Sequence, residues 1–151
     1  MLNVKLKILD ERLGRDFPLP HYETTGSAGM DLRAMVPQAL TLQPGAVELV
    51  PAGFALHIAE AEVAAMIYPR SGLGTRQGIV LGNLTGVIDA DYQGPILMPL
   101  WNRSDTPCTI EVGERVAQLV FTRLMRINFE LTSDFERSER AAGGFGSTGR
   151  N

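Results

Sequence analysis

Short apolar runs, each ended by glycine or proline, dominate the hydrophobic pattern of this chain. At the start, Leu2, Val4, Leu6 and Ile8 alternate with polar residues, which predicts a half-buried strand. Further apolar runs follow at 47–50, 54–58, 63–68, 79–81, 96–101 and 116–121. Glycine or proline interrupts them at 44–45, 51–53, 82, 86, 94 and 113. Many short strands with regular turn signals predict an all-β fold, a jelly-roll-like β-sandwich or β-barrel.

Two short segments depart from the strand pattern. Residues 60–66 could form one helical turn or the start of a strand. Residues 71–77 are expected to form one short helix, with Ser71 as its N-cap. No long helical period competes with the strands elsewhere, so the fold is expected to carry a single short helix.

The character of the chain changes after Asp134. Charged residues are followed by a glycine-rich stretch at 141–151 with almost no apolar side chains, which cannot bury enough surface to fold alone. We therefore expect a β domain over 1–134 and a flexible C-terminal arm over 135–151. Phe145 is either an exposed aromatic without a role or an anchor that becomes ordered only on a ligand.

Composition narrows the class of protein. A chain of 151 residues with 44% apolar and 21% charged residues is typical of one globular domain. A net charge of −3 argues against a general binder of nucleic acid or membrane surfaces. The single cysteine, Cys108, excludes an intramolecular disulfide and suits a reducing, cytoplasmic compartment. We expect neither a signal peptide nor a membrane span, because the N-terminus alternates and no run of 18 apolar residues occurs.

The run 86–94, GVIDADYQG, is the most informative stretch for chemistry. If it is extended, Asp89 and Asp91 lie on one face and Tyr92 on the other. Two carboxylates at that spacing could hold a cation or activate a water, and the tyrosine offers a flat surface for a sugar or base. The alternative is that Asp and Gly simply form a turn.

The run 69–74, PRSGLG, places Arg70 and Ser71 at the expected helix start. Backbone N–H groups and the positive end of a helix suit phosphate, and an arginine adds a bidentate partner. The alternative is a surface turn with a capping serine. Gln118 lies on an otherwise apolar strand and faces either inward or the solvent.

Two further patterns carry less weight. Residues 144–149 match Gly-x-Gly-x-x-Gly, but a dinucleotide fingerprint needs a strand before it and a helix after it, and only two residues follow. The histidines, His21 and His57, are isolated and no zinc spacing occurs. Magnesium carried mainly by substrate phosphates remains open.

Together these stretches resemble the trimeric dUTP diphosphatase (dUTPase) family. Five segments match in order, at 28–32 (AGMDL), 69–74 (PRSGLG), 86–94 (GVIDADYQG), 113–118 (GERVAQ), and Arg140 with 143–149. The resemblance implies a jelly-roll-like subunit in a homotrimer with shared active sites. It also implies hydrolysis of dUTP to dUMP and pyrophosphate with Mg²⁺, which supplies dUMP for thymidylate synthesis and keeps uracil out of DNA.

The resemblance assigns roles to residues around the nucleoside. Asp89 is the base that orients and deprotonates the attacking water. Tyr92 packs under the deoxyribose and leaves no room for a ribose 2′-hydroxyl. The uracil edge is bound by Asn83 and by the backbone of a hairpin from Leu84 to about Leu97, which includes Val87 and Ile88.

The phosphates and the arm receive their roles in the same way. The resemblance implies that the phosphates are bound by Arg70, Ser71, Gly72 and Gln118. Asp31 supports the site and the water shell of the metal, and no direct protein ligand to Mg²⁺ is expected. From the arm, Phe145 stacks on uracil, while Arg140, Ser147 and Thr148 close over the γ-phosphate.

One departure and two other functions stand beside this interpretation. The family usually has glycine after the arm arginine, and this chain has Ala141, which reduces backbone freedom there and puts the path of the arm in doubt. The same pocket could belong to a nucleotide-gated binding module without chemistry. A related enzyme of the same fold would deaminate dCTP.

Overall fold

A computed structural model describes residues 2–136 and 138. Its elements in chain order are β1 (Lys5–Ile8), β2 (Met30–Arg33), β3 (Leu40–Leu42), β4 (Val47–His57), β5 (Val63–Pro69), α1 (Ser71–Arg76), β6 (Ile79–Leu81), β7 (Gly86–Ile88), β8 (Pro95–Asn102), β9 (Cys108–Ile110) and β10 (Arg115–Arg123). All strand pairs are antiparallel. The prediction of an all-β, jelly-roll-like fold with one short helix is confirmed.

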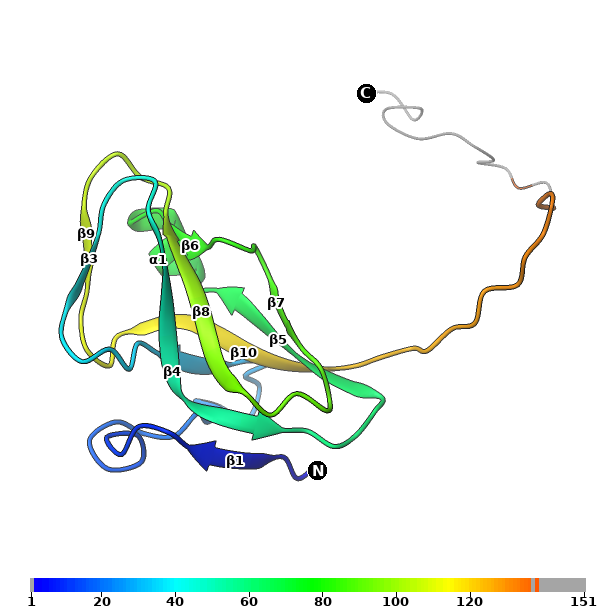
Figure 1. Ribbon diagram of the computed structural model, residues 1–151, viewed down its shortest axis with the longest axis horizontal. Helices are drawn as coiled ribbons and strands as arrows, with labels where there is room; N and C mark the ends of the chain where they lie inside the picture. Colours follow the sequence, from blue (N-terminus) through cyan, green and yellow to red (C-terminus); the bar gives the residue numbers. More distant parts are fainter. Residues whose placement is uncertain (1, 137, 139–151) are drawn as a thin grey trace.

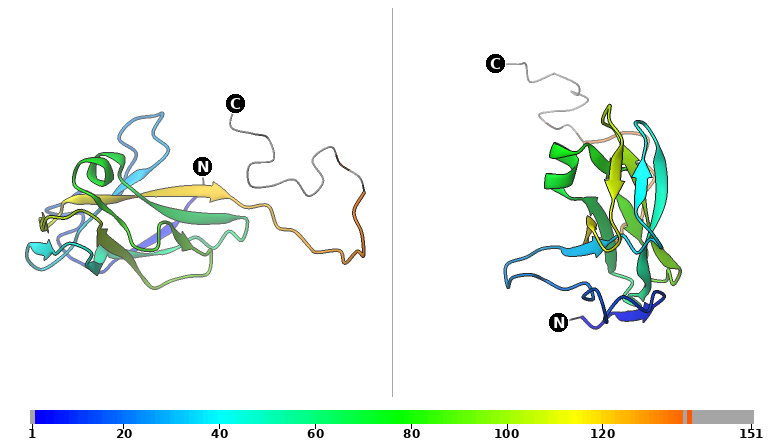
Figure 2. Two further views of the ribbon diagram at one scale, coloured as in Figure 1. Left: turned by 90° about the horizontal axis from the view of Figure 1, so that it is seen from above. Right: turned by 90° about the vertical axis from the view of Figure 1, so that its left-hand side faces the viewer.

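Two four-stranded sheets face each other across the core. One has the order β1-β4-β8-β6 and the other β2-β10-β5-β7, while β3 and β9 form a separate ribbon at one end (Figure 1). The two views of Figure 2 show α1 at the same end as this ribbon, outside the sheets. The largest fully buried side chains are Phe54, Leu32, Leu42, Ile58, Ile79, Leu81, Ile96, Met98, Leu100, Ile110, Leu119 and Val50. Alternate residues of β8 supply this core, as expected for a strand with one buried face.

The predicted break at 51–53 is wrong, because β4 runs through it. The strand continues from Val47 to His57, and its pairing with β8 shifts register between Pro51 and Ala55. Gly53 has a φ of +83° there. The glycine and proline therefore form an irregularity that bends one long strand instead of a turn between two.

The N-terminal strand is shorter and more exposed than its alternation predicts. β1 covers only Lys5–Ile8, and all four residues are exposed in the single chain. Residues 60–66 are expected from the sequence to form either one helical turn or the start of a strand. They contain the start of a strand, because a turn at 61–62 leads directly into β5.

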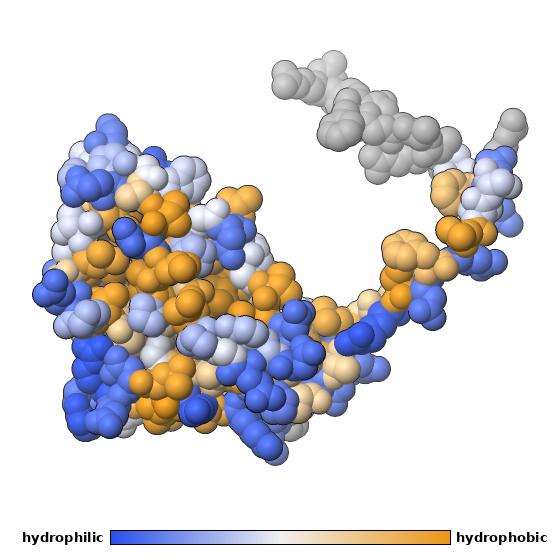
Figure 3. Space-filling model, viewed as in Figure 1, coloured by the Kyte–Doolittle hydropathy of each residue, from blue (hydrophilic) through white to orange (hydrophobic). Residues whose placement is uncertain are grey.

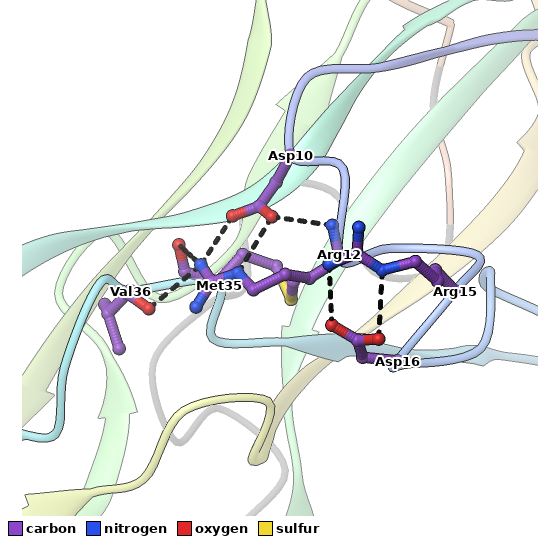
Figure 4. Close-up of polar contacts among 6 residues, drawn as sticks. All are labelled: Asp10, Arg12, Arg15, Asp16, Met35 and Val36. Atoms are coloured by element: carbon purple, nitrogen blue, oxygen red, sulfur yellow. Dashed lines mark hydrogen bonds and ion pairs between the residues drawn. The ribbon is translucent and has the colours of Figure 1, made fainter.

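Charged hydrogen bonds from Arg12 hold the loop after β1 against the segment that follows β2 (Figure 4). The guanidinium of Arg12 donates to Asp10 through Nε at 2.9 Å and Nη2 at 2.6 Å, and Nη2 also donates to the carbonyl oxygen of Val36 at 3.0 Å. The Arg12 guanidinium holds the pKa of the Asp10 carboxyl below its ordinary value. Farther along this loop, the Phe17 ring lies where a Cβ at Gly113 would be. Gly113 is part of the turn that leads into β10.

The segment after β10 extends away from the sheets (Figure 1). Residues 124–136 contain no helix or strand. Met125, Ile127, Phe129 and Leu131 alternate along it and are exposed by 90%, 60%, 92% and 98%. Within the described residues, no helix is long and apolar enough to cross a membrane.

Candidate functional site

A pocket of about 590 Å³ lies where α1 meets the β2–β10 edge. It is lined by Asp31, Arg70, Ser71, Gly72, Leu73, Arg76, Gln77, Glu114, Arg115 and Gln118. Three distant segments therefore meet in one place: the start of β2, the β5–α1 junction and the first half of β10. The pocket brings together Arg70, Ser71, Gly72 and Gln118, which are predicted to bind phosphate, and Asp31, which is predicted to support the site and the water shell of the metal.

Asp31 organises the cationic side of this pocket. Its Oδ1 accepts from Nε of Arg70 at 2.8 Å, and its Oδ2 accepts from Nη1 of Arg115 at 3.1 Å. A carboxylate between two guanidinium groups fixes the direction of both while leaving other N–H groups of each arginine available. The arrangement is suited to binding an anion with several oxygens.

Gln118 occupies the half-buried position that its strand alternation allows. Its Nε2 donates to the carbonyl oxygen of Pro69 at 3.0 Å, and its Oε1 lies 3.0 Å from the position a Cβ would take at Gly29. Gly29 therefore leaves room for the glutamine amide. The hydrogen bond ties β10 to the residue just before Arg70.

The prediction that Ser71 is the N-cap is wrong. Arg70 takes the N-cap position with φ −85° and ψ 129°, and it makes no side-chain capping hydrogen bond. Ser71 is the first helical residue and is exposed. Its hydroxyl is therefore not engaged as a cap, and Ser71 lines the pocket next to Arg70.

Residues 86–94 are not extended throughout, because the extended backbone ends at Ile88. β7 ends there, and the N–H of Tyr92 donates to the carbonyl oxygen of Asp89 at 3.2 Å, which closes a turn. Asp89 and Asp91 therefore belong to a turn and do not share one face of a strand. The N–H of Ala59 donates to the carbonyl oxygen of Ala90 at 2.9 Å and holds this turn against the end of β4.

The segment between β7 and β8 is a wide loop and not a two-stranded ladder. β7 pairs with β5, whereas β8 pairs with β4 and β6, so the two strands belong to different sheets. The Tyr92 hydroxyl donates to the carbonyl oxygen of Pro95 at 3.0 Å. A Cβ at Gly94 would overlap the Tyr92 ring. Glycine at this position thus lets the ring fold back over its own loop.

Most residues predicted to contact the base are exposed on the segments around β7 and β8. Asn83, Val87 and Leu97 are exposed, Val87 by 59% and Leu97 by 42%, and Ile88 is half-buried. β7 is an edge strand, so one side of its backbone has no partner strand among the described residues. Unpaired N–H and C=O groups on such an edge can bind the edge of a planar base.

Asp89 does not lie with the arginine pocket. It lines a second pocket of about 380 Å³ together with His57, Ala90, Asp91 and Arg126 among others. Ile88 pairs with Ala65 near the start of β5, whereas Arg70 follows Pro69 at its end. At 3.3 Å per residue, Asp89 and Arg70 are separated by roughly 20 Å. One chain therefore carries the Asp89 loop and the arginine pocket at opposite ends of β5.

Sequence reasoning missed part of the arginine pocket. Arg76 lies outside the five matching segments, and the resemblance assigns no role to Glu114 or Arg115 in segment 113–118. Glu114 accepts from the N–H of Glu111 at 2.9 Å, which shapes the turn before β10. Behind the pocket, Cys108 donates to Oε1 of Gln77 at 3.2 Å, and burial together with Glu114 raises the pKa of its thiol. This thiol is thereby kept protonated, which suits a packing residue.

The arm residues Arg140, Phe145, Ser147 and Thr148, with Ala141, lie outside the described residues. Within residues 2–136 and 138, no three His, Cys, Asp or Glu side chains gather as a metal site.

Known proteins of one family are similar to this chain over nearly its whole length. The dUTPase family model matches residues 15–149. The deoxyuridine 5′-triphosphate nucleotidohydrolase of Shewanella denitrificans is 59% identical over 146 residues, covering 97% of this chain and 96% of the relative.

Solved structures share the fold. The Staphylococcus bacteriophage 80alpha dUTPase with dUPNHPP has a TM-score of 0.83 at 24% identity, covering 99% of both chains. A mutant dUTPase from phage phi11 of S. aureus has a TM-score of 0.76 at 19% identity, covering 89% of this chain and 99% of that one. That phage protein coordinates a structural Mg(II) ion.

Proposed function

This chain belongs to the dUTPase family, and from that membership we infer that it is a dUTP diphosphatase, which hydrolyses dUTP to dUMP and pyrophosphate. The reaction supplies dUMP for thymidylate synthesis and keeps uracil out of DNA. One observation of the chain carries the proposal: a carboxylate-bearing loop beside an edge strand and an arginine-lined pocket occupy the two ends of β5. The first suits a nucleoside and a water, and the second suits a polyphosphate.

We propose that Asp89 orients and deprotonates the attacking water. Its carboxylate is exposed in the single chain and lines an open pocket, so a substrate brought there can reach it. A general base must lie within about 3 Å of the water it activates, directly or through one further water. The turn that holds Asp89 is fixed by the bond from Ala59 to Ala90, which limits how far the carboxylate can move from β5.

Binding of the nucleoside is assigned to the loop between the sheets. Asn83 and the backbone around Val87, Ile88 and Leu97 would bind the uracil edge, where cytosine presents donors and acceptors in reversed positions. Buried groups left unpaired by the wrong base can give discrimination of about 10⁴ to 10⁵. The folded-back ring of Tyr92 would lie under the deoxyribose and exclude a 2′-hydroxyl.

Binding of the phosphates is assigned to Arg70, Ser71, Gly72 and Gln118, with Asp31 holding Arg70 in place. Phosphoanhydride hydrolysis depends mainly on positioning and on neutralising charge. For residues beyond those described, we propose that an arm over 135–151 closes the site, with Phe145 on uracil and Arg140, Ser147 and Thr148 at the γ-phosphate. Closure of this kind excludes water from the reacting groups.

Magnesium is the proposed cofactor. The donor set around the phosphate pocket offers Asp31 and Glu114, but Asp31 is engaged by two arginines and Glu114 by a backbone N–H. This set fits an ion bound chiefly by phosphate oxygens, with Asp31 contacting its water shell. When bound, Mg²⁺ would neutralise charge on the phosphates.

The resemblance to the trimeric family is the basis for proposing a homotrimer, and an assembly of more than one copy is supported because one chain cannot bring the Asp89 loop and the arginine pocket together. Reacting groups must approach to about 3.5 Å, against a separation of roughly 20 Å along β5. Apolar surface is also exposed over β4 and β8, where Val47 and Leu49 are 51% and 65% exposed (Figure 3). The alternating apolar residues of 125–131 are a second surface that another copy would cover. We propose a cytoplasmic location, which suits the lone cysteine.

A substrate panel tests the function. Purified protein with Mg²⁺ is given dUTP, dTTP, dCTP or UTP, and pyrophosphate and ammonia are both measured. We expect pyrophosphate from dUTP at least about 100-fold faster than from the other three. Tight dUTP binding without pyrophosphate would favour the nucleotide-gated binding module, and ammonia from dCTP would favour the deaminase.

A further inference from the structure

We propose that Arg76, at the end of α1, binds the polyphosphate of the substrate directly as a third arginine of the pocket. This inference rests on the proposed function, since it names a further residue for the same substrate. It starts from the lining of the pocket, where Arg76 stands beside Arg70, Ser71 and Gly72 although none of the sequence motifs includes it.

The Arg76 guanidinium packs against Gly72. Its Nη2 lies 3.0 Å from the position that a Cβ would take at Gly72, and its Cζ lies 3.7 Å from it. The side chain therefore bends back along the helix from the last turn to the first. A Cβ at position 72 would require the guanidinium to shift by a few tenths of an ångström. Gly72 thus makes room for a cation beside the residues that are assigned to the phosphates.

The charges of the pocket favour a direct role for this arginine. Arg70 and Arg115 both donate to Asp31, while Glu114 adds a second carboxylate to the lining. Among the described lining residues, three arginines face two carboxylates, so without Arg76 the pocket would have no net positive charge. Over the part of the chain that the structure describes, Arg76 pairs with no carboxylate. Its donors remain available for phosphate oxygens, which a guanidinium binds in bidentate fashion.

Arg103 provides a matched control. It carries the same charge, is exposed, and lies against the same helix, where its Nη2 donates to the carbonyl oxygen of Gly74 at 3.4 Å. Arg103 is not among the residues lining the pocket. Arg76→Gln and Arg103→Gln therefore remove one positive charge each near α1, but only the first removes it from the pocket.

The test measures binding and not turnover. Each full-length protein is titrated with dUPNHPP by calorimetry and with deoxyuridine, which has no phosphate, by NMR. We expect Arg76→Gln to weaken dUPNHPP binding by about tenfold, Arg76→Lys by about threefold, and Arg103→Gln by less than about twofold, with deoxyuridine affinity unchanged in all three.

Two results would overturn the assignment. One is a dUPNHPP affinity of Arg76→Gln equal to that of Arg103→Gln. The other is an equal loss of deoxyuridine affinity, which would mean that the substitution disturbs the fold of the pocket. Failure of the proposed hydrolysis would be seen separately, as dUTP left intact by the unsubstituted protein.

Discussion

Nε of Arg70 lies 2.8 Å from Oδ1 of Asp31, which joins the residue before α1 to the strand β2. The two side chains are 32% and 21% exposed, so the pair lies at the pocket wall and not in the core. Its consequence is orientation: the guanidinium that is proposed to bind phosphate cannot turn away from the pocket while Asp31 holds it.

The first prediction concerns this pair. Asp31→Asn keeps the size of the side chain but removes the charge that holds Arg70 and Arg115. We expect kcat/KM for dUTP to fall by about 10- to 100-fold, because misplacement of a binding group by about 1 Å has effects of that size. Steady-state pyrophosphate release measures it. An unchanged kcat/KM would show that Arg70 is positioned without Asp31.

The second prediction concerns the sugar. Tyr92→Ala removes the ring that folds back over Gly94, and it opens the space proposed to exclude a 2′-hydroxyl. The ratio of kcat/KM for dUTP over UTP should fall by about tenfold or more, since specificity from steric exclusion is lost with the excluding group. Tyr92→Phe is the control: it loses only the bond to Pro95 and should keep most of the ratio. Equal ratios in all three proteins would remove Tyr92 from sugar selection.

The third prediction concerns the turn before β10. Gly113 has a φ of +76°, and a Cβ there would overlap the Phe17 ring. Gly113→Ala should lower the free energy of unfolding by about 2–3 kcal/mol, measured by urea denaturation.

Two other glycines separate the causes of that loss. Gly45 has a φ of +78° but nothing within 4 Å of its Cβ position, so Gly45→Ala should cost only the backbone strain, about 1 kcal/mol. Gly26 has open space and no positive φ, and Gly26→Ala should be close to neutral. A cost at Gly113 no larger than at Gly45 would contradict the packing of Phe17 on the turn.

The fourth prediction concerns acid stability. The pKa of Asp10 is lowered in the folded protein by the Arg12 guanidinium, so its stabilising effect is present above the ordinary carboxyl pKa of about 3.9. That effect is lost as the pH falls through the lowered folded-state pKa. Asp10→Asn should therefore destabilise the protein by about 1 kcal/mol at pH 7 and by less as the pH approaches 3.

Asp16→Asn is the comparison for Asp10. Asp16 pairs with Arg15 at 3.0 Å, but the two side chains are 49% and 65% exposed, and water screens such pairs. We expect no measurable change in unfolding free energy at either pH. A loss at Asp10 that stays constant between pH 7 and 3 would mean that charge is not its cause.

Much of the fold could be predicted from the sequence, because strands 63–69, 79–81, 95–102 and 115–123 follow apolar runs closely. The continuity of β4 could not be predicted. Pro51 and Gly53 usually end a strand, and here the strand continues because its pairing with β8 shifts register between Pro51 and Ala55. In the site, Asp31, Arg70 and Gln118 meet in one pocket as their motifs suggest. Arg76 lies outside the matched segment 69–74, but its i+4 spacing from Gly72 on the expected helix places both residues on one helix face, and this spacing could have identified it.

The separation of Asp89 from Arg70 depends on the tertiary structure. Both residues flank the same strand pair, yet they lie at its opposite ends, so no motif spacing could reveal the distance. Under the proposed function, the site is completed where two copies place these ends together.

The most direct test is complementation between two inactive variants. Asp89→Asn lacks the proposed base but keeps the arginine pocket, and Arg70→Gln has the opposite defect; each alone should have lost most turnover. Co-expressed in equal amounts, they should form sites with both halves intact at about one site in four, and pyrophosphate release from dUTP should recover to about a quarter of the normal rate. Activity no higher than the average of the two separate variants would contradict a site shared between copies of this chain.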